Sequence, residues 1–286
     1  MEPEKKSVVQ KKYLNNRFFF VTIIVNKFYI GGDSMAGKNR LDLIRQIIIN
    51  EKNVNVTALS EQFEVTEETI RRDLGKLAIE GVVKRTYGGA ILNAEPGSEG
   101  QHFYKRMTVH STEKKAIALK ALSMLENKHT IAADSSTTVL ETLRLLKNRE
   151  DITVLTNSVE ALHELLQSNM TIISTGGILN SSTMSLQGVI TNQTIENYAF
   201  DVVLVSCKGL DKERGALDSN EAEAGTKLSM LKHAEKVIML MDHTKFDRSA
   251  FLKLADLAHI DYLITDQKPS DNWLSILAQN KIEVIY

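Results

Sequence analysis

The sequence predicts an α/β protein with two structural domains, and three observations lead to this prediction. The chain has 286 residues, which is enough for two domains of ordinary size. Its hydrophobic share of 43% supports substantial apolar cores. The hydrophobic pattern also changes along the chain, from short amphipathic helices near the N-terminus to alternating strands and helices in the remainder.

The composition limits the classes of protein to which the chain can belong. The formal net charge is −1, so any contact with nucleic acid must come from a local basic patch. The single cysteine, Cys207, excludes a disulfide within the chain and is typical of a reducing cytoplasm, where we expect the protein to act. We expect this cysteine to be a small core residue. The histidines have no metal-ligand spacing and no nucleotide-binding fingerprint is present, so we expect no metal and no cofactor.

Residues 1–34 differ in composition from the rest of the chain. Their apolar run, residues 18–25, is shorter than the about 20 residues that span a bilayer, so we expect no membrane association. No small-residue cleavage site follows the run, which argues against a secretory signal peptide. Gly31-Gly32-Asp33 can be encoded by a bacterial ribosome-binding sequence just before Met35. We interpret residues 1–34 as translated upstream DNA, with a genuine disordered extension as the alternative.

Residues 35–93 predict a small domain of three helices and a β-hairpin. Thr57 and Thr66 are expected to cap the second and third helices, after a polar break at residues 51–55. Gly81 is expected to end the third helix. The apolar residues of the three helices recur at helical spacing: Leu41, Ile44 and Ile48, then Leu59 and Phe63, then Ile70, Leu74 and Leu77.

The third helix and the residues after it bring basic side chains together. Residues 82–91 predict a two-stranded wing with a glycine turn, which completes a winged helix-turn-helix domain. Arginine on such a helix reads guanine edges or phosphates in the major groove, and a basic wing reaches the DNA backbone or the minor groove. The alternative is a solvated face balanced by Glu67, Glu68, Asp73 and Glu80. We expect contacts with operator DNA from Thr57, Thr66, Thr69, Arg71, Arg72, Lys76, Lys84, Arg85 and Tyr87.

A linker and a parallel-sheet α/β domain are predicted for the remaining residues. Residues 94–107 contain clustered proline, glycine and serine, as is typical of a linker. Residues 108–286 alternate between strands and helices, which favours a parallel sheet covered on both faces. The expected strands are residues 131–133, 153–155, 171–174, 202–205, 237–240 and 262–264, and the expected helices are 114–125, 139–146, 159–166, 222–233 and 273–279.

Polar or glycine-rich segments follow four of these expected strands. Ligands of such sheets bind beyond the carboxyl ends of the strands. The segment at residues 134–138 places hydroxyl groups at a helix start, which suits a phosphate group. The alternative for each segment alone is helix capping, the usual role of Ser, Thr and Asn. The four together favour one pocket, formed by Asp134, Ser135, Ser136, Thr137, Thr138, Thr156, Asn157, Ser158, Gly176, Gly177, Lys208 and Gly209.

Both halves of the chain resemble the DeoR family of bacterial transcriptional regulators. In the first half, the motif Thr-Ile-Arg-Arg-Asp-Leu occupies residues 69–74, and Tyr87 stands where the family's wing usually has histidine. Ser136 stands where the family's first sensor loop usually has glycine, so a side chain there can narrow the phosphate pocket. The matching segments of the second half are residues 134–138, 156–158, 176–177, 209–211, 218–227 and 241–246.

The resemblance implies a repressor of sugar-metabolism genes whose C-terminal domain is similar in fold to ribose-5-phosphate isomerase. It implies a phosphorylated sugar as effector and adds Asp218, Glu221 and Lys245 to the expected effector contacts. The alternative is a working aldose–ketose isomerase, since a carboxylate and a lysine are the groups that such chemistry needs. An operator-reading domain makes catalysis superfluous, so we expect no enzyme activity. One recognition helix reads too few base pairs, and we expect a dimer or tetramer assembled through the second domain.

Overall fold

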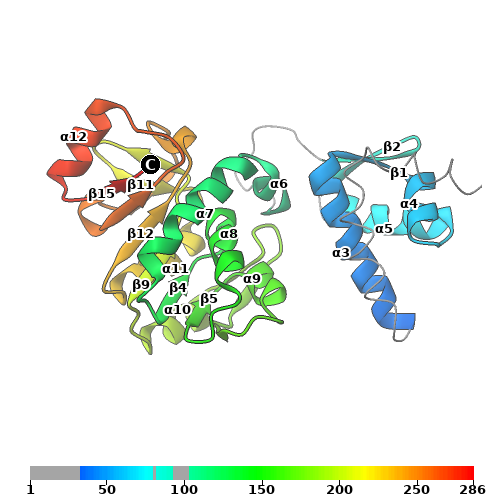
Figure 1. The fold of residues 1–286 in the computed structure, drawn as a ribbon, viewed down its shortest axis with the longest axis horizontal. Coiled ribbons are helices and arrows are strands. Elements are labelled where there is room, and N and C mark those ends of the chain that lie inside the picture. The colour runs from blue at the N-terminus through cyan, green and yellow to red at the C-terminus, as the bar shows by residue number, and fades with distance from the viewer. Residues whose placement is uncertain (1–32, 80–81, 93–102) are drawn as a thin grey trace, which may run out of the picture.

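The computed structural model describes residues 33–79, 82–92 and 103–286 (Figure 1). The hypothesis about residues 1–34 therefore lies almost entirely outside the described residues, apart from Asp33 and Ser34 at the start of the first described helix. The expected helix end at Gly81 and the linker segment 94–100 also lie outside them.

The first half of the chain contains the three predicted helices and the predicted wing. The helices are α3 (Asp33–Glu51), α4 (Val56–Gln62) and α5 (Glu67–Ile79). The wing consists of β2 (Val83–Thr86) paired antiparallel with β3 (Gly89–Leu92). A further strand, β1 (Asn53–Asn55), pairs with β3 and makes the sheet three-stranded. The predicted polar break at residues 51–55 was therefore wrong in part, because Val54 between two polar neighbours is buried against the core.

The helix caps differ from the prediction at one of two positions. Thr66 caps α5 as expected, since its Oγ1 accepts a hydrogen bond from the Thr69 amide at 3.3 Å. The cap of α4 is Asn55 rather than Thr57. The side-chain oxygen of Asn55 accepts hydrogen bonds from the amides of Thr57 at 2.8 Å and Ala58 at 3.3 Å. Thr57 thus lies inside the first turn of the helix.

The core of this half is built on the predicted apolar stripe of α5. Ile70, Leu74 and Leu77 are fully buried. Beside them, Asp73 is also buried and accepts a hydrogen bond from Nε of Arg40 on α3 at 2.7 Å. Asp73 therefore holds α3 against α5 and does not belong to a solvated acidic face.

The second half contains a seven-stranded parallel sheet. Its order is β15-β14-β12-β9-β4-β5-β6, and every neighbouring pair is parallel. All six expected strands are present. The seven are β4 (Thr130–Ala133), β5 (Thr153–Thr156), β6 (Thr171–Ser174), β9 (Val202–Val205), β12 (Val237–Leu240), β14 (Tyr262–Ile264) and β15 (Glu283–Ile285).

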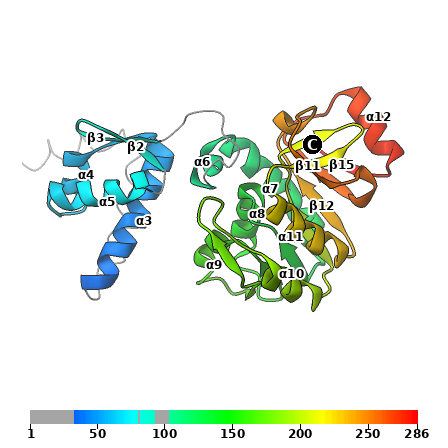
Figure 2. The same cartoon turned by 180° about the vertical axis from the view of Figure 1, so that it is seen from behind.

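Helices cover both faces of this sheet. Figure 1 shows α7 (Ser111–Leu125) and α8 (Thr137–Leu146) in front of it, and Figure 2 shows α10 (Val189–Glu196) and α11 (Glu221–Lys232) on the opposite face. All residues of β9 and β12 are buried, which explains why these strands are continuous apolar runs. Two further helices, α9 (Val159–Glu164) and α12 (Asp271–Gln279), lie toward the two ends of the sheet.

Several short strands of the second half were not predicted. β10 (Gly209–Asp211), β11 (Gly215–Asp218) and β13 (Leu252–Ala255) form a small antiparallel sheet. β7 (Ile178–Asn180) and β8 (Ser185–Gln187) form a hairpin. These strands lack the continuous apolar runs of the buried strands in the parallel sheet, so the sequence gives little signal for them.

A helix also occupies part of the predicted linker. Residues 103–107, which fall within the expected linker 94–107, form most of α6 (Phe103–Thr108). Three of its side chains, those of Phe103, Tyr104 and Met107, are buried. The helix lies between α3 and the sheet domain in Figure 1 and packs as part of the core, not as a solvated connection.

Gly177, one of the expected effector residues, is required by the backbone after β6. Its φ is +113°, and an added Cβ would lie 2.1 Å from Thr191 Oγ1 and 2.7 Å from Gln187 O. Gly225 in α11 offers a contrast, because an added Cβ there meets nothing within 4 Å. The two positions form a matched pair for testing this part of the fold.

We expect Gly177→Ala to lower the free energy of unfolding by about 1–3 kcal/mol, because both backbone strain and a steric clash oppose it. Gly225→Ala should raise the free energy of unfolding by about 0.5–1 kcal/mol, since alanine is favoured over glycine inside a helix. Urea denaturation followed by circular dichroism measures both. Equal stability of the two variants would contradict the described course of the loop after β6.

Candidate DNA interface and anion site

The predicted DNA-contacting residues lie on one exposed surface formed by α5 and the wing. Arg71, Arg72 and Lys76 on α5 are exposed, and so are Lys84 and Arg85 on β2. Nη1 of Arg85 donates a hydrogen bond to the backbone oxygen of Arg71 at 3.0 Å, which holds the wing against the helix. The helix and the wing therefore present their basic groups as one unit. Tyr87 at the turn between the wing strands is fully exposed.

Glu67 organises the polar residues at the start of α5. Its carboxylate lies 2.5 Å from Nη2 of Arg71 and accepts a hydrogen bond from Thr57 Oγ1 at 2.8 Å. The hydroxyl groups of Thr66 and Thr69 lie 2.9 Å apart. Part of the charge of Arg71 is thus balanced within the helix, as the solvated-face alternative assumes, whereas Arg72, Lys76 and the wing lysine add to a local basic surface.

A buried lysine connects the loops at the carboxyl ends of the strands. The ammonium group of Lys227 on α11 lies 2.6 Å from Asp218 Oδ2 and 3.4 Å from Asp134 Oδ2, and donates to Ser206 O at 2.9 Å. Asp134 also accepts hydrogen bonds from the amides of Ser136 at 2.8 Å and Ser206 at 3.1 Å. Burial alone would lower the pKa of Lys227, but Asp218 and Asp134 outweigh it and raise this pKa. The two carboxylates therefore fix these loops in place.

Two of the expected effector residues act as helix caps. Oγ of Ser136 accepts a hydrogen bond from the Val139 amide at 3.4 Å at the start of α8, and Oγ of Ser158 accepts one from the Ala161 amide at 3.1 Å at the start of α9. The capping alternative therefore describes these two hydroxyl groups. Ser136 has φ −79° and ψ 148°, an extended conformation open to any residue, so the serine in the glycine position introduces no backbone strain.

Basic side chains gather close to these loops. Burial, followed by the positive charges of Arg106 and Lys227, lowers the pKa of Lys208 to about 7. Burial also lowers the pKa of Lys245, against the opposing charge of Asp242. Among the described residues, neither Lys208 nor Lys245 has a carboxylate within 4 Å. Neither lysine is in direct contact with a carboxylate of the described residues, although the charge of Asp242 acts on Lys245 and the charges of Asp218 and Glu223 act on Lys208.

Arg106 and Lys114 belong to the same cluster and were not predicted. The charge of Arg106 acts on Lys114, Lys208 and Lys245 alike. Nε of Arg106 is buried and has no hydrogen-bond partner among the described residues. Burial lowers the pKa of Lys114 to about 8, and its ammonium donates to the backbone oxygens of Arg106 and Val109. Sequence reasoning missed both because Arg106 falls in the predicted linker and Lys114 begins a predicted helix, where nothing in the sequence marks it as buried.

The remaining expected effector residues divide into buried and exposed groups. Thr137, Thr138 and Asn157 are buried, and Oδ1 of Asn157 has no hydrogen-bond partner among the described residues. Thr156 is buried and donates to Ala133 O at 2.8 Å. Glu221 is exposed at the start of α11, whereas Glu223 two residues later is buried. Ser135 and Gly209 are buried, Gly176 is half-buried and Gly177 is exposed.

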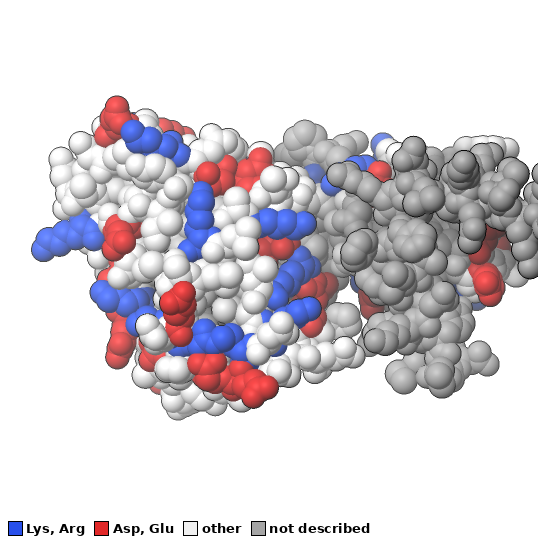
Figure 3. All heavy atoms as spheres, viewed as in Figure 1, with Lys and Arg blue, Asp and Glu red and all other residues white. Residues whose placement is uncertain are grey.

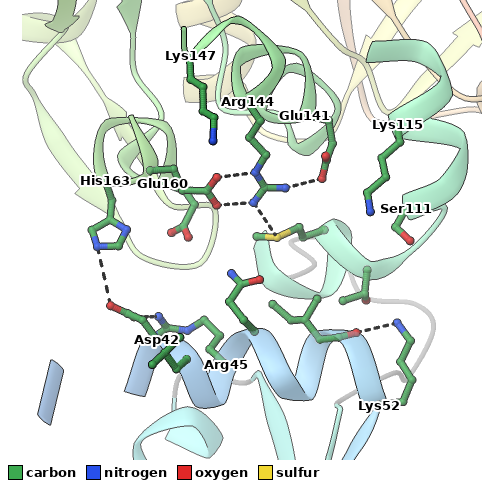
Figure 4. A pocket seen from close by; sticks show the side chains of 16 residues that line it. Asp42, Arg45, Lys52, Ser111, Lys115, Glu141, Arg144, Lys147, Glu160 and His163 are labelled. Carbon is green, nitrogen blue, oxygen red and sulfur yellow. Dashed lines mark hydrogen bonds and ion pairs between the residues drawn. The ribbon is translucent and has the colours of Figure 1, made fainter. Parts of the chain in front are cut away.

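A cavity of about 990 Å³ lies elsewhere, between α3 and the helices α6, α8 and α9 (Figure 4). Most of its charged groups are already paired. Arg144 contacts the carboxylates of Glu141 and Glu164, and His163 Nε2 lies 3.8 Å from Asp42 Oδ2. Arg106, Lys208 and Lys245 do not line this cavity, so it is separate from the basic side chains at the strand ends.

α6 connects the cation cluster to this cavity. The guanidinium of Arg45 on α3 lies 4.7 Å from the ring centroid of Tyr104, and Tyr104 donates a hydrogen bond to Glu160 Oε2 at 3.0 Å. Burial raises the pKa of Glu160, against the opposing hydrogen bond from Tyr104. Tyr104 is two residues from Arg106, so one short helix contacts both the DNA-binding half and the cation cluster.

Three further features of the described residues concern metal binding, the cysteine and membrane spans. They contain no group of three or more His, Cys, Asp and Glu residues arranged to hold a metal ion. Cys207 is buried, and burial raises the pKa of its thiol to about 12. No described helix has the length and apolar character needed to cross a membrane. On the face seen in Figure 3, acidic and basic side chains are interspersed over the sheet domain.

A winged helix-turn-helix domain joined to an α/β domain with basic side chains at its strand ends is the architecture of a DNA-binding regulator with a sensor domain. Comparison with known families agrees with this class. Residues 40–95 match the DeoR-like helix-turn-helix domain, and residues 109–267 match the DeoR C terminal sensor domain. The chain belongs to the DeoR family of transcriptional regulators.

Individual relatives extend over nearly the whole chain. The uncharacterized HTH-type transcriptional regulator YulB of Bacillus subtilis is 36% identical over 87% of this chain and 96% of its own length. The L-fucose operon activator of Haemophilus influenzae is 32% identical over 86% of this chain and 98% of its own length. The putative aga operon transcriptional repressor of Escherichia coli O157:H7 is 31% identical over 86% of this chain and 92% of its own length.

The chain also has weak similarity to solved structures. Ribose 5-phosphate isomerase A of Methanocaldococcus jannaschii matches 48% of this chain and 55% of its own, with 14% identity and a TM-score of 0.36.

We expect Arg72→Ala to weaken binding to an operator selected from random-sequence DNA by about 1–3 kcal/mol, because an arginine on α5 reads a base edge. Arg71→Ala should have an effect in the same range or smaller, since Glu67 already pairs with Arg71. Lys236→Ala removes an exposed lysine of the sheet domain and serves as the matched control. Gel-shift titrations at one fixed salt concentration measure all three, and wild-type affinity in Arg72→Ala would place the recognition surface elsewhere.

Proposed function

We propose that the protein is a cytoplasmic repressor of sugar-metabolism genes whose operator binding responds to a phosphorylated sugar. The observation that carries this proposal is the cluster of Arg106, Lys208 and Lys245 at the carboxyl ends of the parallel strands. Unpaired cations in a partly buried site are unfavourable until an anion joins them. The relatives named for L-fucose and aga operons support a sugar derivative as the ligand.

A phosphate group suits this site better than the carboxylate group of a sugar acid. The start of α8 offers free backbone N–H groups beside Thr137 and Thr138, and helix starts attract anions. Arginine and lysine provide full charges for a dianion. Asn157 then remains for the sugar hydroxyl groups, since its buried Oδ1 lacks a hydrogen-bond partner among the described residues. Asp134, Asp218 and Lys227 support the loops.

α6 is the proposed route from the effector to the DNA-binding domain. A phosphate that draws Arg106 toward Lys208 and Lys245 moves the helix that carries Tyr104. Tyr104 contacts both Arg45 of α3 and Glu160 of α9. The effector changes operator affinity only if it binds two arrangements of this junction unequally, and such coupling is typically about 1–3 kcal/mol.

Repression and self-association complete the proposal. One relative is named as an activator and another as a repressor. We propose repression relieved by the effector, because a bound helix-turn-helix domain blocks a promoter without any further contact.

One α5 helix reads too few base pairs to select an operator in a genome, so we propose that two chains bind together, as a dimer or within a tetramer.

An isomerase is the alternative function for the same pocket. Asp218, one of the two expected carboxylates, is paired with Lys227, and the other, Glu221, is exposed. We propose binding without turnover for this reason. An isomerase assay on hexose and pentose phosphates separates the two functions, since catalysis at a rate above the buffer control would support the enzyme.

We expect the double variant Thr137→Val and Thr138→Val to keep wild-type operator affinity and to lose the response to the effector. The valines remove two hydroxyl groups at the anion-binding helix start while keeping side-chain shape. Ser136→Gly should keep the response, because serine there contributes only a cap. Calorimetry with hexose and pentose phosphates, and with the unphosphorylated sugars, measures binding. Equal binding of phosphorylated and unphosphorylated sugars would exclude a phosphate site at α8.

We also expect binding of the effector at pH 8 to take up protons. Above its pKa of about 7, Lys208 is mostly neutral in the empty site, and a dianion favours the charged form. Affinity should therefore fall as the pH rises from 7 to 9. Lys208→Arg keeps its charge over this range and should take up fewer protons. Calorimetry in buffers of different ionisation enthalpy measures the uptake; the same uptake in wild type and Lys208→Arg would exclude Lys208 from the site.

A further inference from the structure

We infer that one charge-free surface of the sensor domain binds the same surface of a second copy of the chain. This surface, called here the pairing surface, consists of β6, the β7–β8 hairpin and the first turn of α10. The inference rests on the proposed function, which requires two DNA-binding domains on one operator, and it names the residues that bring them together.

The first observation is the distribution of charge. Residues 165–195 contain no Asp, Glu, Lys, Arg or His, although 25% of the whole chain is charged. No other segment of the sequence continues as far without a charged residue. The cores of protein interfaces are depleted of charge. In a two-fold contact a surface meets itself, so any charge near the axis would face a like charge. A neutral surface satisfies this condition of self-association.

The second observation is a group of exposed apolar side chains on that segment. The exposed fractions are 74% for Ile178, 56% for Leu179, 71% for Val189 and 62% for Ile190. Ile178 lies beside the start of α10, which carries Val189 and Ile190. A Cβ added to Gly188 would lie 3.6 Å from Ile178 Cδ1. Contiguous exposed apolar side chains of this size mark interaction sites.

The third observation is the edge of the sheet beside them. β6 is the edge strand and pairs only with β5 among the described strands. Thr171 and Ser174 are exposed, and Ile172 and Ile173 are only half-buried, whereas β9 and β12 are buried throughout. Parallel sheets are normally covered, and uncovered edges promote association. A second copy on the pairing surface would cover this edge.

The pairing surface adjoins the expected effector loop. Gly176 and Gly177 separate β6 from Ile178, and Thr191 on α10 donates a hydrogen bond to Gly176 O at 2.7 Å. A Cβ added to Gly176 would lie 3.8 Å from Cγ2 of Ile190. Self-association and effector binding therefore share a loop.

The test measures self-association of the full chain by sedimentation velocity over a range of concentrations. Ile190→Lys should raise the dissociation constant at least about 30-fold, because it places like charges together in an apolar interface. Leu119→Lys is the matched control, since Leu119 on α7 is exposed at 61% and Ile190 at 62%, and it should leave association unchanged. Circular dichroism melting and titration with hexose and pentose phosphates confirm that each variant is folded.

A charge-pair experiment tests the two-fold arrangement. Ile178→Lys and Ile178→Glu should each associate weakly alone, and an equal mixture should recover association. The alternative to a second copy is that the apolar run at residues 18–25 covers the pairing surface. A full chain with Phe20→Asp and Ile24→Asp should associate like the wild type.

Three results would overturn the inference: a wild-type chain that remains monomeric on and off operator DNA, Ile190→Lys that associates normally, or loss of association in the Phe20→Asp and Ile24→Asp chain. The operator and effector titrations are read separately. Wild-type operator and effector responses with normal association in Ile190→Lys would reject the pairing surface while leaving the proposed function in place.

Discussion

The geometry of the sensor domain depends on the ammonium group of Lys227. It sits between Asp134 at the end of β4 and Asp218 on β11, and it also donates to Ser206 after β9. A buried charge without partners is strongly unfavourable, so the fold must bring Lys227, Asp134 and Asp218 together. This requirement fixes the relative positions of the loops after three strands and of α11. Lys227 therefore holds the loops near the basic side chains in place, and it does so without a bound ligand.

The pocket beside this balanced group has the opposite character. Lys208 and Lys245 are half-buried without a carboxylate within 4 Å among the described residues, and Arg106 has a buried nitrogen without a hydrogen-bond partner among them. Proteins rarely keep such groups where they serve structure alone. The helix α6 carries Arg106, and it also carries Tyr104, which contacts Arg45 of the DNA-binding half.

The sequence predicted the recognition unit and the six principal strands because their signals are strong. The stripe Ile70, Leu74 and Leu77 and the continuous apolar runs of β9 and β12 follow from burial alone. Strands of three residues carry no such pattern, so β1, β7 and β10 were missed. Glu221 was chosen as a pocket residue because it lies in a family segment, but only tertiary packing shows that Glu223 is the buried one. Arg106 was missed because clustered proline, glycine and serine just before it indicated a linker.

If a sugar phosphate binds the basic side chains at the strand ends, as proposed, sugar supply also affects the lifetime of the protein. Binding then stabilises the folded chain by mass action, about 2.7 kcal/mol at a ligand concentration of 100 times Kd. A chain without its ligand opens more often, and opened chains are the ones that proteases cut. Depletion of the sugar phosphate would thus speed degradation of the regulator as well as change its affinity for DNA. The cell would then adjust the amount of regulator and its occupancy of the operator with one small molecule.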